Sequence, residues 1–182
     1  MRMIGPNIIL REYRAEDIDA IRAFVLNNDI TQYLSAVFLQ PHTREFTLSF
    51  LDRVLKGEDN AFRFVVARRD DESYLGQIDL FAINRQCRSG ELGVTLGAED
   101  RLGRGIGTEA IGLLLDFAFG YQNLHRVHLR VRARNARAIR CYEKCGFVKE
   151  GTQREAYYFN GEYGDDYVMA ILEQEWRKMR GR

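Results

Sequence analysis

The chain has 182 residues, of which 46% are hydrophobic and 29% charged, and its formal net charge is +1. This length suits one domain, expected over residues 1–182, and the apolar share argues against an intrinsically disordered chain. A net charge so close to zero argues against a nucleic-acid footprint over the whole domain. The first six residues lack a sustained apolar run, so we expect no signal peptide or membrane span, which indicates a cytoplasmic protein.

The amino-terminal part of the chain alternates between strand and helix patterns. Alternation over Asn7–Tyr13 predicts a strand, and apolar residues at helical spacing predict a helix over Asp17–Leu26. Thr43 is a candidate N-cap for a second helix, which Gly57 would end.

The middle of the chain returns to strand patterns before a long apolar helix. Runs rich in Phe, Val and Ile predict strands over residues 61–68 and 74–82, joined as a hairpin. A third strand is predicted over Glu91–Leu96. After a glycine-rich turn, an apolar helix is expected to run to Phe119.

The glycine-rich turn contains Gly103, Gly105 and Gly107, where a strand must turn into a helix. Glycine lets the backbone approach a ligand closely, and the N–H groups at a helix start favour an anion. The turn therefore predicts a phosphate or pyrophosphate site. It is no P-loop, because the loop has no lysine, and no dinucleotide fingerprint, because Thr108 stands at the third glycine position.

The carboxyl-terminal part continues with a strand, a helix and a hairpin. Alternation predicts a strand over residues 127–133, and a helix is expected over Asn135–Cys145. Two further strands are predicted over residues 147–152 and 163–172. The Asn160–Gly161 pair between aromatic runs is a strong hairpin signal.

A row of basic residues lies on one face of the strand between residues 126 and 134. It could be an RNA-binding stripe, for instance a surface that docks on the ribosome. Alternatively, these residues pair with acids on neighbouring elements or on the partner in a homodimer. The near-zero net charge favours pairing.

The three cysteines, Cys87, Cys141 and Cys145, include no C-x-x-C pair. Cys141 and Cys145 share a helical stripe with Ala138 and Tyr142, which predicts buried structural thiols rather than reactive ones. The histidines are scattered without metal-ligand spacing, so no catalytic metal is expected.

Two motifs together point to a family. The first is Leu102-Gly-Arg-Gly-Ile-Gly107 before a helix, and the second is Asn135-x-x-Ala-x-x-x-Tyr142-x-x-x-Gly146-Phe147. In this order and spacing they resemble the GNAT superfamily of acyl-CoA-dependent N-acetyltransferases, over almost the whole chain. The family expects Gln or Arg where Leu102 stands, and an apolar residue there resembles the branch that acetylates protein N-termini and polyamines.

This resemblance implies an α/β (α+β) fold of the GNAT type: a mixed, mostly antiparallel sheet with a splayed central strand and flanking helices. It also implies acetyl-CoA as acyl donor, with its pyrophosphate on the glycine turn and its pantetheine arm paired with the backbone of residues 94–96. The expected cofactor-binding residues are Val94, Thr95, Leu96, Gly103, Arg104, Gly105, Gly107, Thr108 and Asn135.

The resemblance also places Tyr142 near the thioester sulphur, where its hydroxyl would protonate the leaving thiolate. Glu91 is the best-placed candidate base, since it shares a face with Thr95 if the strand alternates regularly, and it would act through water. A salt-bridged or structural role for Glu91 remains the alternative. Asp165 is a weaker candidate base.

The implied reaction moves an acetyl group from acetyl-CoA to a primary amine by direct attack in a ternary complex. The overall plan resembles ribosomal-protein N-terminal acetyltransferases, whereas the 158–163 hairpin and the 62–66 strand resemble spermidine N-acetyltransferases. The acceptor is therefore either a protein N-terminus, such as that of a ribosomal protein, or a polyamine. A polyamine site would need converging carboxylates, with Asp29, Glu45 and Glu91 as candidates.

A non-catalytic acyl-CoA-binding regulatory module is the alternative from another class of protein. Such a binder needs neither Tyr142 nor Glu91, so both residues argue for an enzyme.

Overall fold

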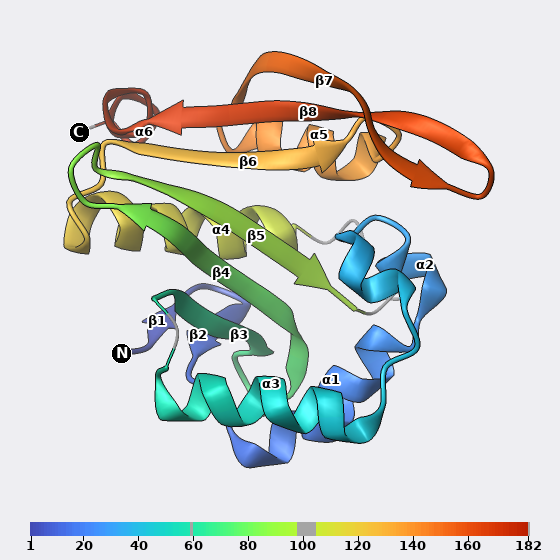
Figure 1. The fold of residues 1–182 in the computed structure, drawn as a ribbon. Helices are drawn as coiled ribbons and strands as arrows, with labels where there is room; N and C mark the ends of the chain where they lie inside the picture. Colours follow the sequence, from blue (N-terminus) through green and yellow to red (C-terminus); the bar gives the residue numbers. More distant parts are fainter. Residues whose placement is uncertain (59, 98–104, 182) are drawn as a thin grey trace. The chain divides into compact units, whose positions relative to one another are not determined.

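The computed structural model describes residues 1–58, 60–97 and 105–181 (Figure 1). Contacts along the chain divide it into two compact units. The first unit comprises Met1–Asp79 with Val94–Leu113, and the second comprises Leu80–Gly93 with Leu114–Arg182.

Within the described residues, eight strands form a sheet in the order β1-β2-β3-β4-β5-β6-β8-β7. The β1–β2, β2–β3, β6–β8 and β7–β8 pairs are antiparallel, and the β5–β6 pair is parallel. The strands are β1 (Met3–Ile4), β2 (Ile8–Arg11), β3 (Phe62–Arg68), β4 (Tyr74–Asn84), β5 (Ser89–Leu96), β6 (Arg126–Arg132), β7 (Val148–Phe159) and β8 (Glu162–Leu172).

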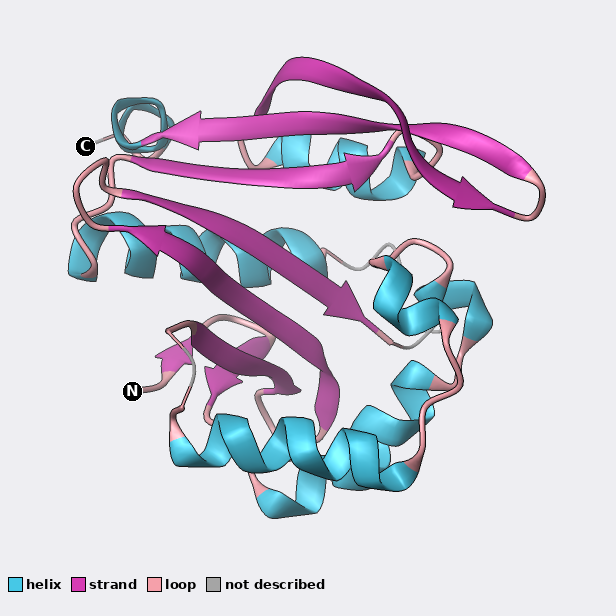
Figure 2. Cartoon of the chain, in the orientation of Figure 1, coloured by secondary structure: helices cyan, strands magenta, loops and turns pink. Residues whose placement is uncertain are grey.

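Helices and short helical turns connect these strands (Figure 2). The α-helices are α1 (Ile18–Val25), α2 (Asn28–Thr31), α3 (Arg44–Lys56), α4 (Ile106–Asp116), α5 (Ala136–Lys144) and α6 (Glu173–Met179). The shorter turns are η1 (Ala15–Asp17), η2 (Ala36–Leu39) and η4 (Phe117–Tyr121). No described helix has the length and apolar character needed to cross a membrane.

The core of the first unit lies where α1 and α3 pack on strands β2 and β3. Buried side chains from these elements and from the turn after β2 form one apolar cluster: Ile9, Tyr13, Ile18, Ile21, Leu51, Val65 and Ala67. Helix α3 begins and ends as its sequence predicts. The Thr43 side chain accepts a hydrogen bond from the backbone N–H of Phe46, and Gly57 ends the helix in the left-handed conformation at φ 66°.

The second unit contains the β6–β8–β7 part of the sheet. Val127, Leu129 and Val131 alternate along β6 and are buried, while the residues between them carry the basic row. Strands β7 and β8 meet at a tight turn in which Asn160 and Gly161 both have positive φ, at 53° and 86°. This geometry is the one that an Asn-Gly hairpin requires, so that prediction is confirmed.

Two elements differ most clearly from what the sequence predicts. Strand β7 runs to Phe159, beyond the predicted end at residue 152, because two register shifts break the alternation that sequence reading relies on. The apolar helix ends as α-helix at Asp116 and continues as a π-helical turn over Phe117–Tyr121. The short elements β1 and α2 were not predicted, because neither is long enough to show a period.

Candidate active site

The predicted phosphate turn is described only from Gly105 onward, so Leu102, Gly103 and Arg104 lie outside the described residues. Gly105 has φ 80°, a conformation that favours glycine, and a Cβ there would meet no atom within 4 Å. Its carbonyl accepts the N–H of Glu109 at 2.9 Å, which begins helix α4. Gly107 and Thr108 therefore lie in the first turn, where helix N–H groups and the helix dipole favour an anion.

Glu109 ties the start of α4 to the beginning of the chain. One carboxylate oxygen accepts the backbone N–H groups of Asn7 and Ile8 at 2.9 and 3.1 Å, and the other accepts Asn7 Nδ2 at 2.9 Å. The first turn is thus anchored from outside its own helix. Sequence reasoning missed this contact, because an acid in a first helical turn gives no sign of a partner about a hundred residues away.

The end of β5, where Val94, Thr95 and Leu96 were predicted to pair with pantetheine, is held close to β4. A Cβ atom at Gly76 would lie 2.2 Å from the Thr95 carbonyl oxygen and 2.8 Å from Leu96 Cα, so only glycine permits this approach. The N–H of the next residue, Gly97, donates to the Leu75 carbonyl at 2.9 Å. Gly76 is a second residue that sequence reasoning missed.

The parallel ladder between β5 and β6 is short. It pairs Ser89 with Arg126, Gly90 with Val127 and Glu91 with His128, whereas β5 itself runs on to Leu96. In the part of the chain that the structure describes, this register places Glu91 at the last paired position.

Tyr142 lies on α5, whose start is fixed by Asn135. The Asn135 side chain accepts the N–H of Ala138 at 3.1 Å, so the predicted N-cap is confirmed. Tyr142 is only 7% exposed, and its ring packs against Phe147 with 5.9 Å between centroids. Burial, with smaller effects from the Cys141 and Cys145 thiols, raises the pKa of the Tyr142 hydroxyl above its ordinary value. The phenol therefore stays protonated at neutral pH and can donate a hydrogen bond.

The three cysteines differ in environment. Cys145 is buried, Cys141 is half-buried beside Tyr142, and Cys87 is exposed. The helical stripe that Cys141 and Cys145 share with Tyr142 is thus confirmed, while Cys87 lies on the surface.

Glu91 on β5 faces two basic side chains of β6. Arg130 Nε donates to Glu91 Oε1 at 3.4 Å, and His128 Nε2 lies 4.0 Å from Glu91 Oε2. The Glu91 side chain is 16% exposed, so its carboxylate can still be reached from solvent.

The other acidic candidates occupy different places in the fold. Asp165 Oδ1 accepts the backbone N–H of Glu155 at 2.9 Å, a contact within the β7–β8 ribbon. Asp29 and Glu45 are exposed in the first turns of α2 and α3. Backbone and Thr43 hydrogen bonds at the helix start lower the pKa of Glu45.

The basic row on β6 finds acidic partners on β5, on β8 and on β7 beyond β8. Arg126 makes a two-pronged pair with Glu150, and Arg132 Nη1 lies 3.2 Å from Asp166 Oδ1. Together with the Arg130–Glu91 contact, these pairs confirm the expected pairing with acids on neighbouring elements.

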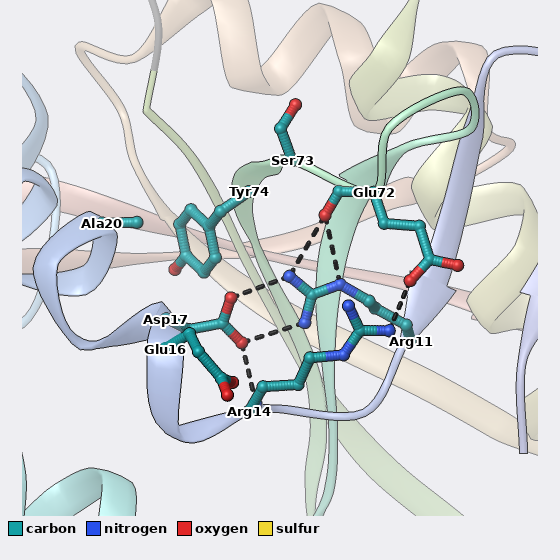
Figure 3. A pocket seen from close by; sticks show the side chains of 8 residues that line it. All are labelled: Arg11, Arg14, Glu16, Asp17, Ala20, Glu72, Ser73 and Tyr74. Atoms are coloured by element: carbon teal, nitrogen blue, oxygen red, sulfur yellow. Dashed lines mark hydrogen bonds and ion pairs between the residues drawn. The ribbon is translucent and has the colours of Figure 1, made fainter.

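The first unit also contains an open hollow of about 400 Å³, lined by charged and polar residues of β2, η1 and the turn before β4 (Figure 3). At its base the Arg11 guanidinium donates to both Asp17 carboxylate oxygens, at 2.9 and 2.7 Å, and to the carbonyls of Glu12 and Glu72. Both side chains of this ion pair are more than nine-tenths buried. The arrangement joins β2, η1 and the β3–β4 turn, which is a structural role.

Metal binding is not supported by any described cluster. Among the residues that the structure describes, no group of three or more His, Cys, Asp or Glu side chains is arranged to hold a metal ion.

Comparison with known proteins identifies a family match and several relatives. Residues 7–148 match the family described as Acetyltransferase (GNAT) domain. The chain is 36% identical over 118 residues to the spermidine N(1)-acetyltransferase of Vibrio cholerae, covering 65% of this chain and 68% of that protein. It is 28% identical over 170 residues to the Escherichia coli K12 spermidine N(1)-acetyltransferase, covering 93% and 88%.

A solved structure extends the similarity to three dimensions. The crystal structure of spermidine N-acetyltransferase from Vibrio cholerae in complex with CoA and spermine matches with a TM-score of 0.83 and 28% identity, covering 94% of this chain and 99% of that one. The predicted fold class and enzyme class are therefore confirmed. The family match over most of the chain and the agreement in fold show that this protein belongs to the GNAT family of acetyltransferases.

Proposed function

We propose that this acetyltransferase moves an acetyl group from acetyl-CoA to a primary amine of a polyamine such as spermidine, by direct attack in a ternary complex. The observation that carries the proposal is the similarity, over 94% of this chain, to a spermidine N-acetyltransferase seen with CoA and spermine. A protein N-terminus is the competing acceptor, and the experiment below separates the two.

Donor binding is assigned to the glycine turn, the end of β5 and the start of α5. The start of α4, with open space at Gly105 and with Gly107 and Thr108 in its first turn, supports a pyrophosphate there, with Gly103 and Arg104 as further family positions. The backbone of residues 94–96 is assigned to the pantetheine arm. Asn135 contacts the cofactor in addition to capping α5.

The chemistry requires the acceptor nitrogen to lose two protons and the departing thiolate to gain one. The acceptor ammonium loses a proton, through water, to Glu91, and the neutral amine nitrogen forms a bond to the thioester carbon. A backbone N–H at the end of β5 stabilises the tetrahedral oxyanion. When the carbon–sulphur bond breaks, the Tyr142 hydroxyl protonates the departing thiolate, a donor role that its buried and protonated state supports. The acylated nitrogen gives up its second proton, which restores the hydroxyl of Tyr142 and leaves a neutral amide.

Recognition of a polyamine needs negative charge, because every amine of the free acceptor carries a proton near neutral pH. Glu91 is assigned to one ammonium group of the acceptor, since its carboxylate is reachable from solvent. Asp29 and Glu45 are further candidates for the remaining cationic groups.

The experiment measures release of the free CoA thiol from acetyl-CoA with single acceptors offered under identical conditions. The panel contains spermidine, spermine and short peptides with free N-termini. Spermidine acetylated on its primary amines is the matched control, because it keeps the chain length but removes the acetylation sites. We expect turnover with spermidine and spermine and none with the control.

Turnover with peptides alone would contradict the polyamine acceptor and support a protein N-terminus. No turnover across the panel, with acetyl-CoA still raising the thermal midpoint, would instead favour a non-catalytic acyl-CoA binder.

A further inference from the structure

The ion pair between Glu91 and Arg130 makes fewer contacts than the other two ion pairs of the basic row on β6. It rests on a single contact of 3.4 Å from Nε, and the Arg130 side chain is 57% exposed. By contrast, Arg126 binds Glu150 with two nitrogens, and Arg132 is held by Asp166 and by the Tyr157 ring at 4.0 Å. Arg130 is therefore the guanidinium of these three that a competing cation displaces most easily.

The register explains why Arg130 reaches Glu91. His128 is the direct cross-strand partner of Glu91, and Arg130 lies two residues farther along β6 on the same face. His128 Nε2 is 4.0 Å from Glu91, and its buried Nδ1 has no hydrogen-bond partner within the described residues. The Glu91 carboxylate thus faces the Arg130 guanidinium and the His128 imidazole ring.

An acceptor ammonium and the Arg130 guanidinium are chemically equivalent partners for one carboxylate. Both are cations that donate hydrogen bonds to oxygen, and the Arg130 side chain that holds Glu91 is itself 57% exposed. Each therefore binds at the expense of the other.

We propose that Arg130 is an intramolecular competitor of the acceptor: it occupies the Glu91 carboxylate in the free enzyme and leaves when an acceptor ammonium binds. The proposal rests on the proposed polyamine acceptor and deepens it, because it makes Arg130 a determinant of acceptor affinity. The chain thereby sets its KM for polyamines above the value that Glu91 alone would give.

The size of the effect follows from the strength of such pairs. Because the Arg130 side chain is 57% exposed and makes one long contact, we expect the pair to favour its closed arrangement by only about 1.5-fold to 5-fold over the open one. Removing the competitor therefore lowers the apparent KM by about twofold to sixfold, because the acceptor no longer has to displace it.

The test compares Arg130→Gln with wild type in steady-state acetylation of spermidine at saturating acetyl-CoA. We expect KM for spermidine to fall by about twofold to sixfold, with kcat unchanged. Arg130→Lys should keep the wild-type KM, because a single ammonium can replace a single Nε contact. Thermal midpoints should stay the same, since the side chain is mostly exposed.

Arg126→Gln is the matched control. Arg126 lies two residues from His128 in the other direction along β6, so its removal subtracts the same charge at a symmetric place while leaving the Arg130–Glu91 pair intact. An equal fall in KM in both variants would overturn the proposal in favour of a general charge effect. An unchanged KM in Arg130→Gln would overturn it as well.

Two further outcomes are distinguishable. A loss of kcat at constant KM in Arg130→Gln would assign Arg130 to positioning Glu91 as a base, against competition. If wild type acetylates no polyamine at all, the proposed function itself fails, and the inference fails with it.

Calorimetric titration of spermidine completes the test. When Arg130→Gln is added to the Glu91→Gln variant, it should no longer tighten spermidine binding, and tighter binding in this double variant would contradict the proposal.

Discussion

At the level of single residues, burial decides what Tyr142 can contribute. Its pKa is raised, so the neutral phenol persists beyond its ordinary midpoint of about 10. A thiol with a pKa near 8.5 is the stronger acid of the two, so full proton transfer from tyrosine to the thiolate is uphill. In the proposed mechanism, Tyr142 therefore first assists departure by a hydrogen bond to the sulphur, and the proton transfers late in the step.

Tyr142→Phe is expected to lower kcat by about 10²-fold, at the modest end for general acid catalysis, with little change in KM for acetyl-CoA. Because the pKa of the Tyr142 hydroxyl is raised, we also expect that deprotonation of this hydroxyl causes no loss of wild-type kcat below about pH 10. Steady-state kinetics between pH 6 and about pH 10 check both expectations.

Tyr163→Phe is the matched control, because it removes the same hydroxyl from an exposed tyrosine. If Tyr142→Phe turns over as fast as this control, Tyr142 is a core residue and not the acid.

The candidate residues for the chemistry come from the sequence, but their structural partners could not be predicted from it. Tyr142, Asn135 and Glu91 are candidates because two spaced motifs and a strand pattern mark their positions. Arg130 appeared only as one member of a basic row, since periodicity assigns a face but not which acid lies opposite. The strand register, which pairs Glu91 with His128, supplies that information.

For strands and helices as well, features set by local backbone chemistry could be predicted from the sequence, whereas long-range contacts could not. The caps at Thr43 and Gly57 and the turn at Asn160–Gly161 follow from local backbone chemistry, and the sequence predicted each. The buried Arg11–Asp17 pair was not predicted. All four residues of β2 are buried, so an arginine there does not mark a solvent-facing side as alternation suggests.

The close approach of β4 and the end of β5 at Gly76 leads to a prediction about donor binding. Gly76→Ala would place a Cβ 2.2 Å from the Thr95 carbonyl, so the backbone of β5 must move. We expect a loss of about 1–3 kcal/mol in the free energy of unfolding. We also expect a rise of about tenfold or more in KM for acetyl-CoA, because the backbone assigned to pantetheine is displaced.

Gly151→Ala is the control for the same change, since a Cβ there meets no atom within 4 Å and β7 has room for it. Urea unfolding and donor kinetics on both variants make the comparison. A Gly76→Ala protein with normal stability and an unchanged KM would show that the end of β5 does not depend on this contact.

For the molecule as a whole, the order of the two family motifs predicted the fold class, which hydrophobic periodicity could not. Alternation and helical spacing gave most elements, but they contain no information on which strands are neighbours in the eight-stranded order. The two family motifs, in the right sequence, supplied the fold class that the comparisons confirm. Where register shifts interrupt alternation, as in β7, even the length of an element was underestimated.

Direct transfer from acetyl-CoA to a polyamine is tested by initial rates with acetyl-CoA and spermidine both varied, while mass spectrometry follows the product. We predict thiol release that requires spermidine, one acetylated spermidine for each thiol, and double-reciprocal lines that intersect, because both substrates must be bound before transfer. Parallel lines would indicate a covalent acetyl-enzyme instead. Thiol release that does not depend on spermidine, with acetyl-CoA binding intact, would contradict the polyamine acceptor.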